Sequence, residues 1–154
     1  MTYAVIMVRS RIGIRPDIKY TLDSFRLNRI NHCVLVPEDV HHKGMLYKVK
    51  DYVTWGEIDP ETLRLLVGKR GRAVGGEELS ESIVRKATPY KSVDELCAAL
   101  AKGDAAMKKF PGLKPLFRLS PPRKGWKGIK RSHRIGGALG YRGDTINELI
   151  RRML

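Results

Sequence analysis

The side chains best suited to chemistry in this sequence are the lysines and arginines gathered between Ala105 and Gly143. This stretch holds eleven cations and no Asp or Glu, whereas the whole chain has 30 Lys and Arg, 16 Asp and Glu and a net charge of +14. The rest of the chain has 19 cations and 16 anions, an excess of only +3. Clustered cations displace the counterions condensed on a polyanion, so they predict phosphate binding. They are Lys108, Lys109, Lys114, Arg118, Arg123, Lys124, Lys127, Lys130, Arg131, Arg134 and Arg142.

The same stretch is rich in glycine and proline, and residues 120–143 offer few apolar side chains. Such a peptide cannot by itself offset the entropy lost on ordering. Held against a polyanion it can order, because its cations pair with phosphates and its glycines let the backbone approach closely. A solvated basic linker is the alternative. Trp126 and Tyr141 count against that alternative, because linkers seldom carry aromatic rings among their cations.

Other motifs have simpler explanations than catalysis. A Gly at every third position over residues 137–143 resembles a phosphate loop, but it lacks the Lys-Ser/Thr pair and a preceding apolar strand. Residues 125–128 have the GxxG form of a KH clamp without the surrounding KH pattern. His41 and His42 are adjacent with no nearby Cys, which is typical of a surface turn. With no spacing that suggests a catalytic triad, the sequence predicts no enzyme, cofactor or metal site.

Size and composition favour a single basic domain. The chain has 154 residues, of which 42% are hydrophobic, and its isoelectric point is near 10.1. This charge points to nucleic acid before an anionic membrane surface. No apolar run approaches the roughly 20 residues of a membrane helix, and residues 1–10 read as a strand rather than a signal peptide. Cys33 and Cys97 lie among apolar neighbours and are expected to be buried thiols, which is consistent with the cytoplasm.

Residues 1–57 are expected to fold as a ferredoxin-like β-α-β-α-β core of α+β class, with both helices on one face of a small sheet. A strand, helix, strand order with a tight connection implies parallel strands joined by a right-handed crossover. The expected strands are 3–8, 32–36 and 53–55, the last closed by Gly56. The expected helices run from Pro16 to about Asn28 and along the stripe of Met45, Leu46 and Val49.

Residues 58–113 are expected to form a helical insert. Helix caps are expected at Asp59, at Ser80 and in the capping box that begins at Ser92, with Gly68 and Gly103 ending two of the helices. A basic loop is expected over residues 69–72. Because residues 58–104 carry eight cations and eight anions, the insert is more typical of a scaffold than of a binding face.

Residues 114–154 complete the unit with a short strand, the basic arm and a last helix. Pro115 to Leu119 predicts an edge strand, with Arg118 pointing outward. The last helix is expected to be capped by Asp144 and to bury Ile146, Leu149, Ile150 and Met153. The basic arm between them is thus tethered at both ends, which favours an extended loop over a free tail.

Two blocks of residues resemble a known family. In the first block, the pattern comprises Arg9-Ser10, Ile12-Gly13, Thr21-Leu22, Leu27-x-Arg29-x-Asn31-His32, Gly44-Met45-x-x-Lys48-Val49-x-x-Tyr52 and Trp55-Gly56. In the second, it comprises Lys114-Pro115-x-Phe117-Arg118-Leu119-x-Pro121-Pro122-Arg123-x-Gly125 and residues 136–143. Both are similar to the large-subunit ribosomal protein L-thirty family, in the archaeal form related to eukaryotic L-seven. The resemblance spans nearly the whole chain, with residues 72–110 ambiguous.

The resemblance implies a ferredoxin-like core bound to large-subunit ribosomal RNA and an arm that reaches further into RNA near the 5S RNA. It implies no membrane and no small-molecule substrate. From the core motif it carries RNA contact onto Arg9, Arg11, Arg29, Asn31 and Lys48, and from the second block onto Arg118, Arg123, Lys124, Tyr141 and Arg142. Charge and aromatic character add Arg15, Lys43, Trp126, Lys127, Lys130, Arg131, His133 and Arg134.

The leading hypothesis is therefore a structural RNA-binding protein of the large ribosomal subunit, located in cytoplasmic ribosomes beside ribosomal RNA and other ribosomal proteins. A DNA-compacting or regulatory basic protein is the first alternative, and it predicts comparable affinity for duplex DNA. An enzyme acting on phosphate esters is the second, and it predicts dependence on a metal or a nucleotide.

Overall fold

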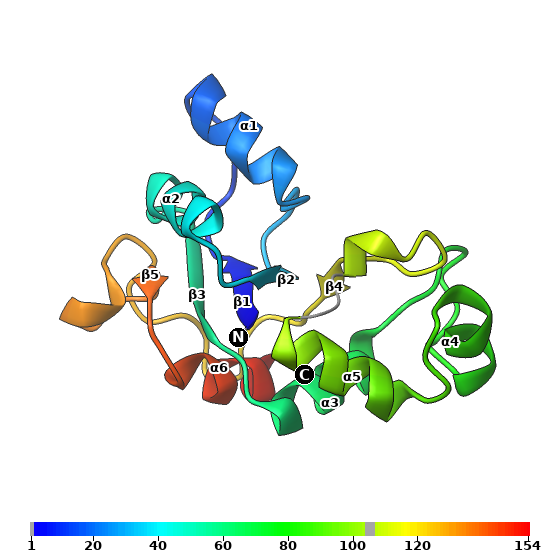
Figure 1. The fold of residues 1–154 in the computed structure, drawn as a ribbon. Helices are drawn as coiled ribbons and strands as arrows, with labels where there is room; N and C mark the ends of the chain where they lie inside the picture. The colour runs from blue at the N-terminus through cyan, green and yellow to red at the C-terminus, as the bar shows by residue number, and fades with distance from the viewer. Residues whose placement is uncertain (1, 104–106) are drawn as a thin grey trace.

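A five-stranded sheet forms the centre of the molecule. The structure is a computed structural model that describes residues 2–103 and 107–154. The strands lie in the order β4-β2-β1-β3-β5, so the first strand of the chain is the middle of the sheet and the two shortest strands form its edges (Figure 1). They are β1 (Thr2–Met7), β2 (His32–Pro37), β3 (Val53–Glu57), β4 (Phe117–Arg118) and β5 (Gly140–Tyr141).

Helices cover both faces of this sheet. Val5 and Met7 of β1 pack with α1 and α2 on one face, whereas Ile6 packs with α3, α5 and α6 on the other. All three side chains are fully buried, which explains why β1 is a continuous apolar run. The six helices of the described residues are α1 (Pro16–Ser24), α2 (Val40–Lys48), α3 (Pro60–Arg70), α4 (Glu81–Ala87), α5 (Val93–Lys102) and α6 (Thr145–Met153).

This arrangement confirms the α+β class and the expected placement of the first two helices on one face. Residues 58–113 add helices beneath the sheet, and residues 114–119 add the expected edge strand at β4, which pairs with β2. The inward side chains of that strand are Phe117 and Leu119, both buried, while Arg118 is exposed. The structure also contains β5, which was not expected from the sequence.

The strand directions correct one prediction. β1 pairs antiparallel with β2 and with β3, with Val5 opposite Val34 on one side and Trp55 on the other. The predicted parallel crossover from the first strand to the second is therefore wrong. Figure 1 shows α1 standing at one end of the sheet, so the chain leaves the sheet, turns through α1 and re-enters in the opposite direction. The parallel crossover instead joins β2 to β3 through α2, with β1 between them.

Helix α1 is shorter than expected. It ends at Ser24 rather than near Asn28, because Arg26 adopts a left-handed backbone conformation with φ 61°. The Leu27 N–H then donates to the Leu22 carbonyl at 2.9 Å, which closes the helix end. A positive φ at a residue other than Gly is uncommon, so hydrophobic spacing alone extends the helix too far.

Helix α3 is longer than expected. It continues through Gly68 and ends at Arg70, with Gly71 beyond it. Lys69 and Arg70, expected in a basic loop, therefore belong to the helix. Gly71 is the position that needs a small residue, because a Cβ there would clash with the Val67 carbonyl and the Leu79 side chain.

Side-chain caps are fewer than expected. Asp59, Ser80 and Asp144 each precede a helix, but none of their side chains accepts a capping hydrogen bond. Ser92 does, since its Oγ accepts from the Glu95 N–H at 3.2 Å, and Gly103 ends α5 with φ 87° as expected. Within the described residues, no helix is long and apolar enough to cross a membrane.

Candidate nucleic-acid interface

The basic stretch forms a loop, residues 120–143, that leaves the β4 edge of the sheet and returns at the β5 edge. Its first part is fastened to α6. The Ser120 N–H donates to the Met153 carbonyl, and the Arg123 N–H donates to the Arg152 carbonyl, both at 3.0 Å. The Arg152 guanidinium donates in return to the carbonyls of Arg123 and Gly125, at 2.6 and 3.1 Å from Nη2. The loop is therefore braced by the body rather than free along its length.

The far half of the loop closes on itself. The Gly137 N–H donates to the Ser132 carbonyl at 2.9 Å, and the His133 N–H donates to the Leu139 carbonyl at 2.8 Å. A Cβ on Gly137 would clash with the Arg131 carbonyl, so only Gly allows this approach. Leu139 and Ala138 are buried in a small cluster with Val8. This cluster attaches the far half to the first strand and its turn.

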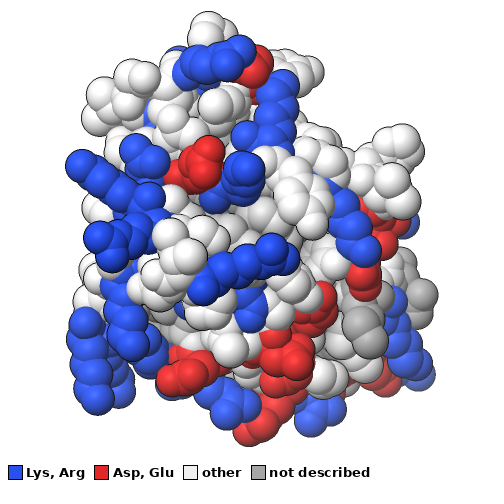
Figure 2. Space-filling view, turned by 90° about the vertical axis from the view of Figure 1, so that its left-hand side faces the viewer, with Lys and Arg blue, Asp and Glu red and all other residues white. Residues whose placement is uncertain are grey.

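Bracing the backbone leaves most of the cations of the loop free. Six of its Lys and Arg side chains are exposed, and none of them makes a hydrogen bond or an ion pair with another described residue. Figure 2 shows Lys and Arg over much of this side of the molecule, with many along its left part, whereas the largest group of Asp and Glu lies low on it. The six are Arg123, Lys124, Lys127, Lys130, Arg131 and Arg134.

Arg142 has a different environment from these six. Its Nε donates to Thr54 Oγ1 at 2.8 Å, and its Nη2 donates to the Ala138 carbonyl at 2.9 Å. Burial, with a smaller contribution from the Arg152 charge, lowers the pKa of Arg142 to about 10. Its contacts join the loop to β3, so Arg142 supports the shape of the loop, and RNA contact by its side chain stays a prediction.

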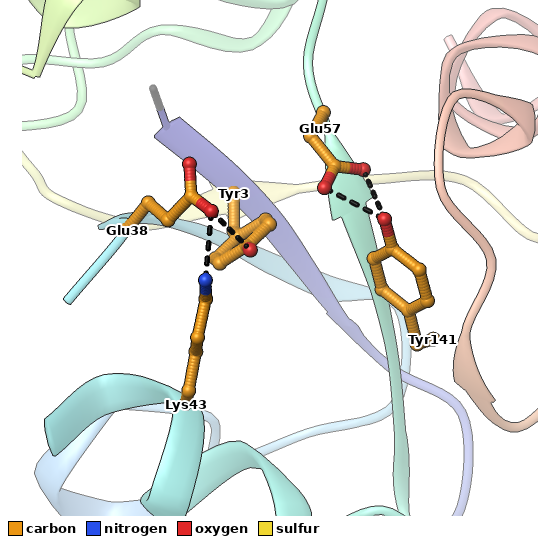
Figure 3. A network of polar contacts seen from close by, with 5 residues as sticks. All are labelled: Tyr3, Glu38, Lys43, Glu57 and Tyr141. Carbon is orange, nitrogen blue, oxygen red and sulfur yellow. Dashed lines mark hydrogen bonds and ion pairs between the residues drawn. The ribbon is translucent and has the colours of Figure 1, made fainter. Parts of the chain in front are cut away.

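The aromatic residues of the loop are also held by the body. Figure 3 shows the Tyr141 hydroxyl donating to both carboxylate oxygens of Glu57, at 2.7 and 2.9 Å, a contact that raises the pKa of Tyr141 to about 12. One face of Tyr141 lies near Trp55, with 6.3 Å between ring centroids. Trp126 is half-buried against the core. Base stacking by these two rings stays a prediction.

Burial, followed by the Arg142 charge, lowers the pKa of the half-buried His133.

Several predicted cations of the body are paired with local partners. Arg11 bonds Asp23 and the Asn28 carboxamide, and Arg15 lies 3.4 Å from Asp17. Surface pairs of this kind contribute little to stability and can exchange partners, so RNA contact by these side chains stays a prediction.

Lys43 and Lys48 of α2 are paired as well. Lys43 Nζ donates to Glu38 at 2.8 Å, and Glu38 also accepts from the Tyr3 hydroxyl (Figure 3). Lys48 lies 3.8 Å from Asp17. The Lys43 pair joins α2 to the end of β2, and the Lys48 pair joins α2 to α1. The charge of these lysines alone did not reveal this structural role.

The first motif places three of its residues near one end of the sheet. Arg9 lies over the Tyr52 ring at 5.2 Å from its centroid and donates to the Asp51 carbonyl. Arg29 is exposed and has no partner among the described residues, whereas Asn31 has φ 65° and a buried Oδ1 without a hydrogen bond. Of the three, Arg29 is therefore the cation most available to a ligand.

Four cations that were absent from the predicted site lie around an open pocket beside β4. Lys114 belongs to the acid-free stretch, and Arg70 and Arg72 to the expected basic loop, but the four are separated in the sequence and no local pattern groups them into one site. The pairing of β4 with β2 and the hydrogen bond from the Lys114 N–H to the Arg72 carbonyl bring their segments together. They are Arg26, Arg70, Arg72 and Lys114.

These features define a small basic α+β protein whose surface is suited to electrostatic contact, with no cluster of three or more metal-ligating side chains among the described residues. The family model for ribosomal protein L30p/L7e matches residues 3–53. Relatives named large ribosomal subunit protein uL30 include that of Methanothrix thermoacetophila, 48% identical over 98% of this chain and 99% of the relative. The protein of Methanococcus maripaludis is 49% identical over the full length of both. The chain belongs to this family of structural, non-enzymatic proteins of the large ribosomal subunit.

Proposed function

We propose that this chain binds large-subunit ribosomal RNA through loop 120–143 and stabilises the RNA near the 5S RNA, beside other large-subunit proteins. The observation that carries the proposal is the set of six exposed, unpartnered cations on an acid-free loop whose backbone is fastened at both ends. The location near the 5S RNA rests on the family resemblance of the second motif block.

The mechanism is electrostatic. Each Lys or Arg that neutralises a phosphate releases condensed counterions, so affinity falls steeply as salt is added. The hydrogen bonds from α6 and within the loop fix the spacing of the cations before RNA arrives, which lowers the entropy lost on binding. Contacts to phosphates carry no base sequence, so the loop would recognise the shape of an RNA junction.

A charge-neutralising triple variant tests the proposal. Lys127→Gln, Lys130→Gln and Arg134→Gln remove three unpartnered cations of the loop. The slope of log affinity against log salt for large-subunit ribosomal RNA is expected to fall by about 2 to 3, because each phosphate contact contributes about 0.7 to 0.9. The melting temperature should not fall below that of the wild type, since these side chains make no bonds within the described residues.

The matched control removes the same charge elsewhere. Lys19, Lys86 and Lys102 are exposed and unpartnered within the described residues, and they lie on α1, α4 and α5. Their replacement by Gln should change the slope much less. Equal slopes for the two triple variants would contradict a role for the loop. Equal affinity of the wild type for duplex DNA and ribosomal RNA would favour the DNA-compacting alternative.

A further inference from the structure

A second concentration of positive charge lies at the opposite edge of the sheet from β5. An open pocket of about 490 Å³ is lined by five cations and, among the described residues, by no Asp or Glu. Two of the cations, Arg70 and Arg72, come from the insert that the sequence suggested was only a scaffold. The other cations are Arg26, Lys114 and Arg118.

Backbone contacts hold these five residues together from distant parts of the chain. Arg118 lies on β4, opposite His32 of β2. The Lys114 N–H donates to the Arg72 carbonyl at 2.9 Å, which ties the insert to the segment before β4. Gly76 also lines the pocket, and a Cβ built there would come no closer than 3.9 Å to Lys114 Nζ. The pocket therefore exists only when core, insert and edge strand are assembled.

Two of the cations that line the pocket also have hydrogen-bond or ion-pair partners within the protein. Arg70 Nη2 donates to Ser120 Oγ at 2.6 Å and lies 3.4 Å from the Leu154 oxygen. Arg72 Nη2 pairs with Glu78 at 3.0 Å, and that carboxylate is largely exposed. Among the described residues, Arg26, Lys114 and Arg118 have no side-chain hydrogen bond or ion pair. Burial lowers the pKa of His32, and the charges of Arg118 and Arg29 lower it further, which is consistent with a positive potential at this edge.

We infer that this pocket is a second RNA-binding site that takes phosphate groups of an RNA backbone, distinct from the segment held by loop 120–143. Guanidinium groups fork onto phosphate oxygens, and the pocket supplies four of them with one ammonium group. An open groove lined by five cations also suits a chain of phosphates better than a single small anion. The inference rests on the proposed function, because it deepens RNA binding rather than replacing it.

The two sites lie at opposite edges of the sheet. β4 and β5 form opposite edges of a five-stranded sheet, and neighbouring strands are about 4.8 Å apart, so the edges are about 19 Å apart. Figure 1 shows the far part of the loop on one side of the molecule and β4 with the insert on the other. One phosphate cannot contact both sites, so the two sites would hold different phosphates of the RNA.

The test is a pair of double variants examined with large-subunit ribosomal RNA. Lys114→Gln with Arg118→Gln removes two cations of the pocket, and Lys86→Gln with Lys102→Gln is the control with the same charge change. The pocket variant should lose about 25- to 60-fold in affinity at 0.1 M salt, and its salt slope should fall by about 1.4 to 1.8. The control should stay close to the wild type.

Hydroxyl-radical footprinting then separates the two sites. The pocket variant should lose protection of one RNA segment and keep the segment protected by the loop, whereas the loop triple variant should show the reverse. If the wild type binds RNA but the pocket variant matches its control in affinity, the inference fails and the proposed function stands. If both sets of variants lose one common footprint, a separate second site is excluded. If the wild type does not bind the RNA, the proposed function itself fails.

Discussion

Arg142 shows how a cation of a basic loop can brace the loop through its own hydrogen bonds. Its guanidinium is largely withdrawn from solvent and satisfies Thr54 Oγ1 and the Ala138 carbonyl. The sequence placed it among eleven cations of one stretch and could not separate it from Arg131 or Arg134, because charge and spacing are alike. Only the fold distinguishes the cation that braces the loop from those left at its surface.

Replacing Arg142 by Ala is expected to destabilise the fold by about 1 to 3 kcal/mol, because it leaves a buried carbonyl and hydroxyl without their donor. Equilibrium unfolding in urea measures this change. Arg134→Ala is the control, since Arg134 is exposed and unpartnered within the described residues, and it should leave the free energy of unfolding within about 0.5 kcal/mol of the wild type. An Arg142→Ala protein as stable as this control would show that the two hydrogen bonds have no bracing role.

At the level of elements, hydrophobic periodicity located every strand of the core and the principal helices. The runs of β1, β2 and β3 and the inward stripe of α6 were visible in the sequence because burial repeats with the period of each element. Hydrophobic periodicity did not reveal strand direction, because a strand-helix-strand order can place the second strand parallel or antiparallel to the first. It also missed β5, a two-residue strand whose Gly140 and Tyr141 carry no apolar alternation.

Backbone conformation at turns and helix ends explains most of the remaining differences between the sequence prediction and the structure. Arg26, Asn31 and Lys124 each adopt a positive φ, which is uncommon for residues other than Gly and which residue type favours only at Asn31. Asp59 and Asp144 have the residue type of a cap but make no capping bond. Residue type indicates which side chains could cap a helix, and the surrounding packing determines which of them form the capping hydrogen bond.

The closed far half of loop 120–143 is expected to depend on Gly137. Gly137→Ala would force its new Cβ against the Arg131 carbonyl, so the closure bonded through Ser132 should open. Limited proteolysis with trypsin is expected to cut the loop at least several-fold faster than in the wild type, because trypsin cleaves after Lys and Arg and the loop contains many of them.

Gly68→Ala provides the control for this glycine substitution. Gly68 lies inside α3 with open space around it, and Ala is favoured over Gly in a helix by roughly 0.5 to 1 kcal/mol. This variant should be as resistant to trypsin as the wild type. Equal cleavage rates for the two variants would contradict the idea that a close backbone approach at residue 137 holds the loop in shape.

At the scale of the whole molecule, the net charge of +14 on one small body sets how the free protein responds to salt. Like charges repel most in the compact state, and this repulsion opposes folding. Raising sodium chloride from about 0.1 to about 1 M shortens the screening length from about 10 to about 3 Å. The melting temperature of the RNA-free protein is therefore expected to rise with salt, as followed by circular dichroism.

The triple variant of Lys19, Lys86 and Lys102 to Gln tests the origin of this rise. With a net charge of +11 in place of +14, it should start from a higher melting temperature at low salt and gain less on addition of salt. A melting temperature that falls with sodium chloride, or an equal gain in both proteins, would exclude self-repulsion as the cause.

The central position of β1 affects how the protein is made. Along the chain β1 is followed by both of its neighbours, β2 and β3, by residue 57. The face that carries Ile6 is completed only when Phe117 and α6 have been made, more than a hundred residues after β1. A nascent chain that stalls before Phe117 would have this sheet face only partly covered, by α3 and α5, so the segment from Phe117 to α6 determines whether its apolar surface is buried.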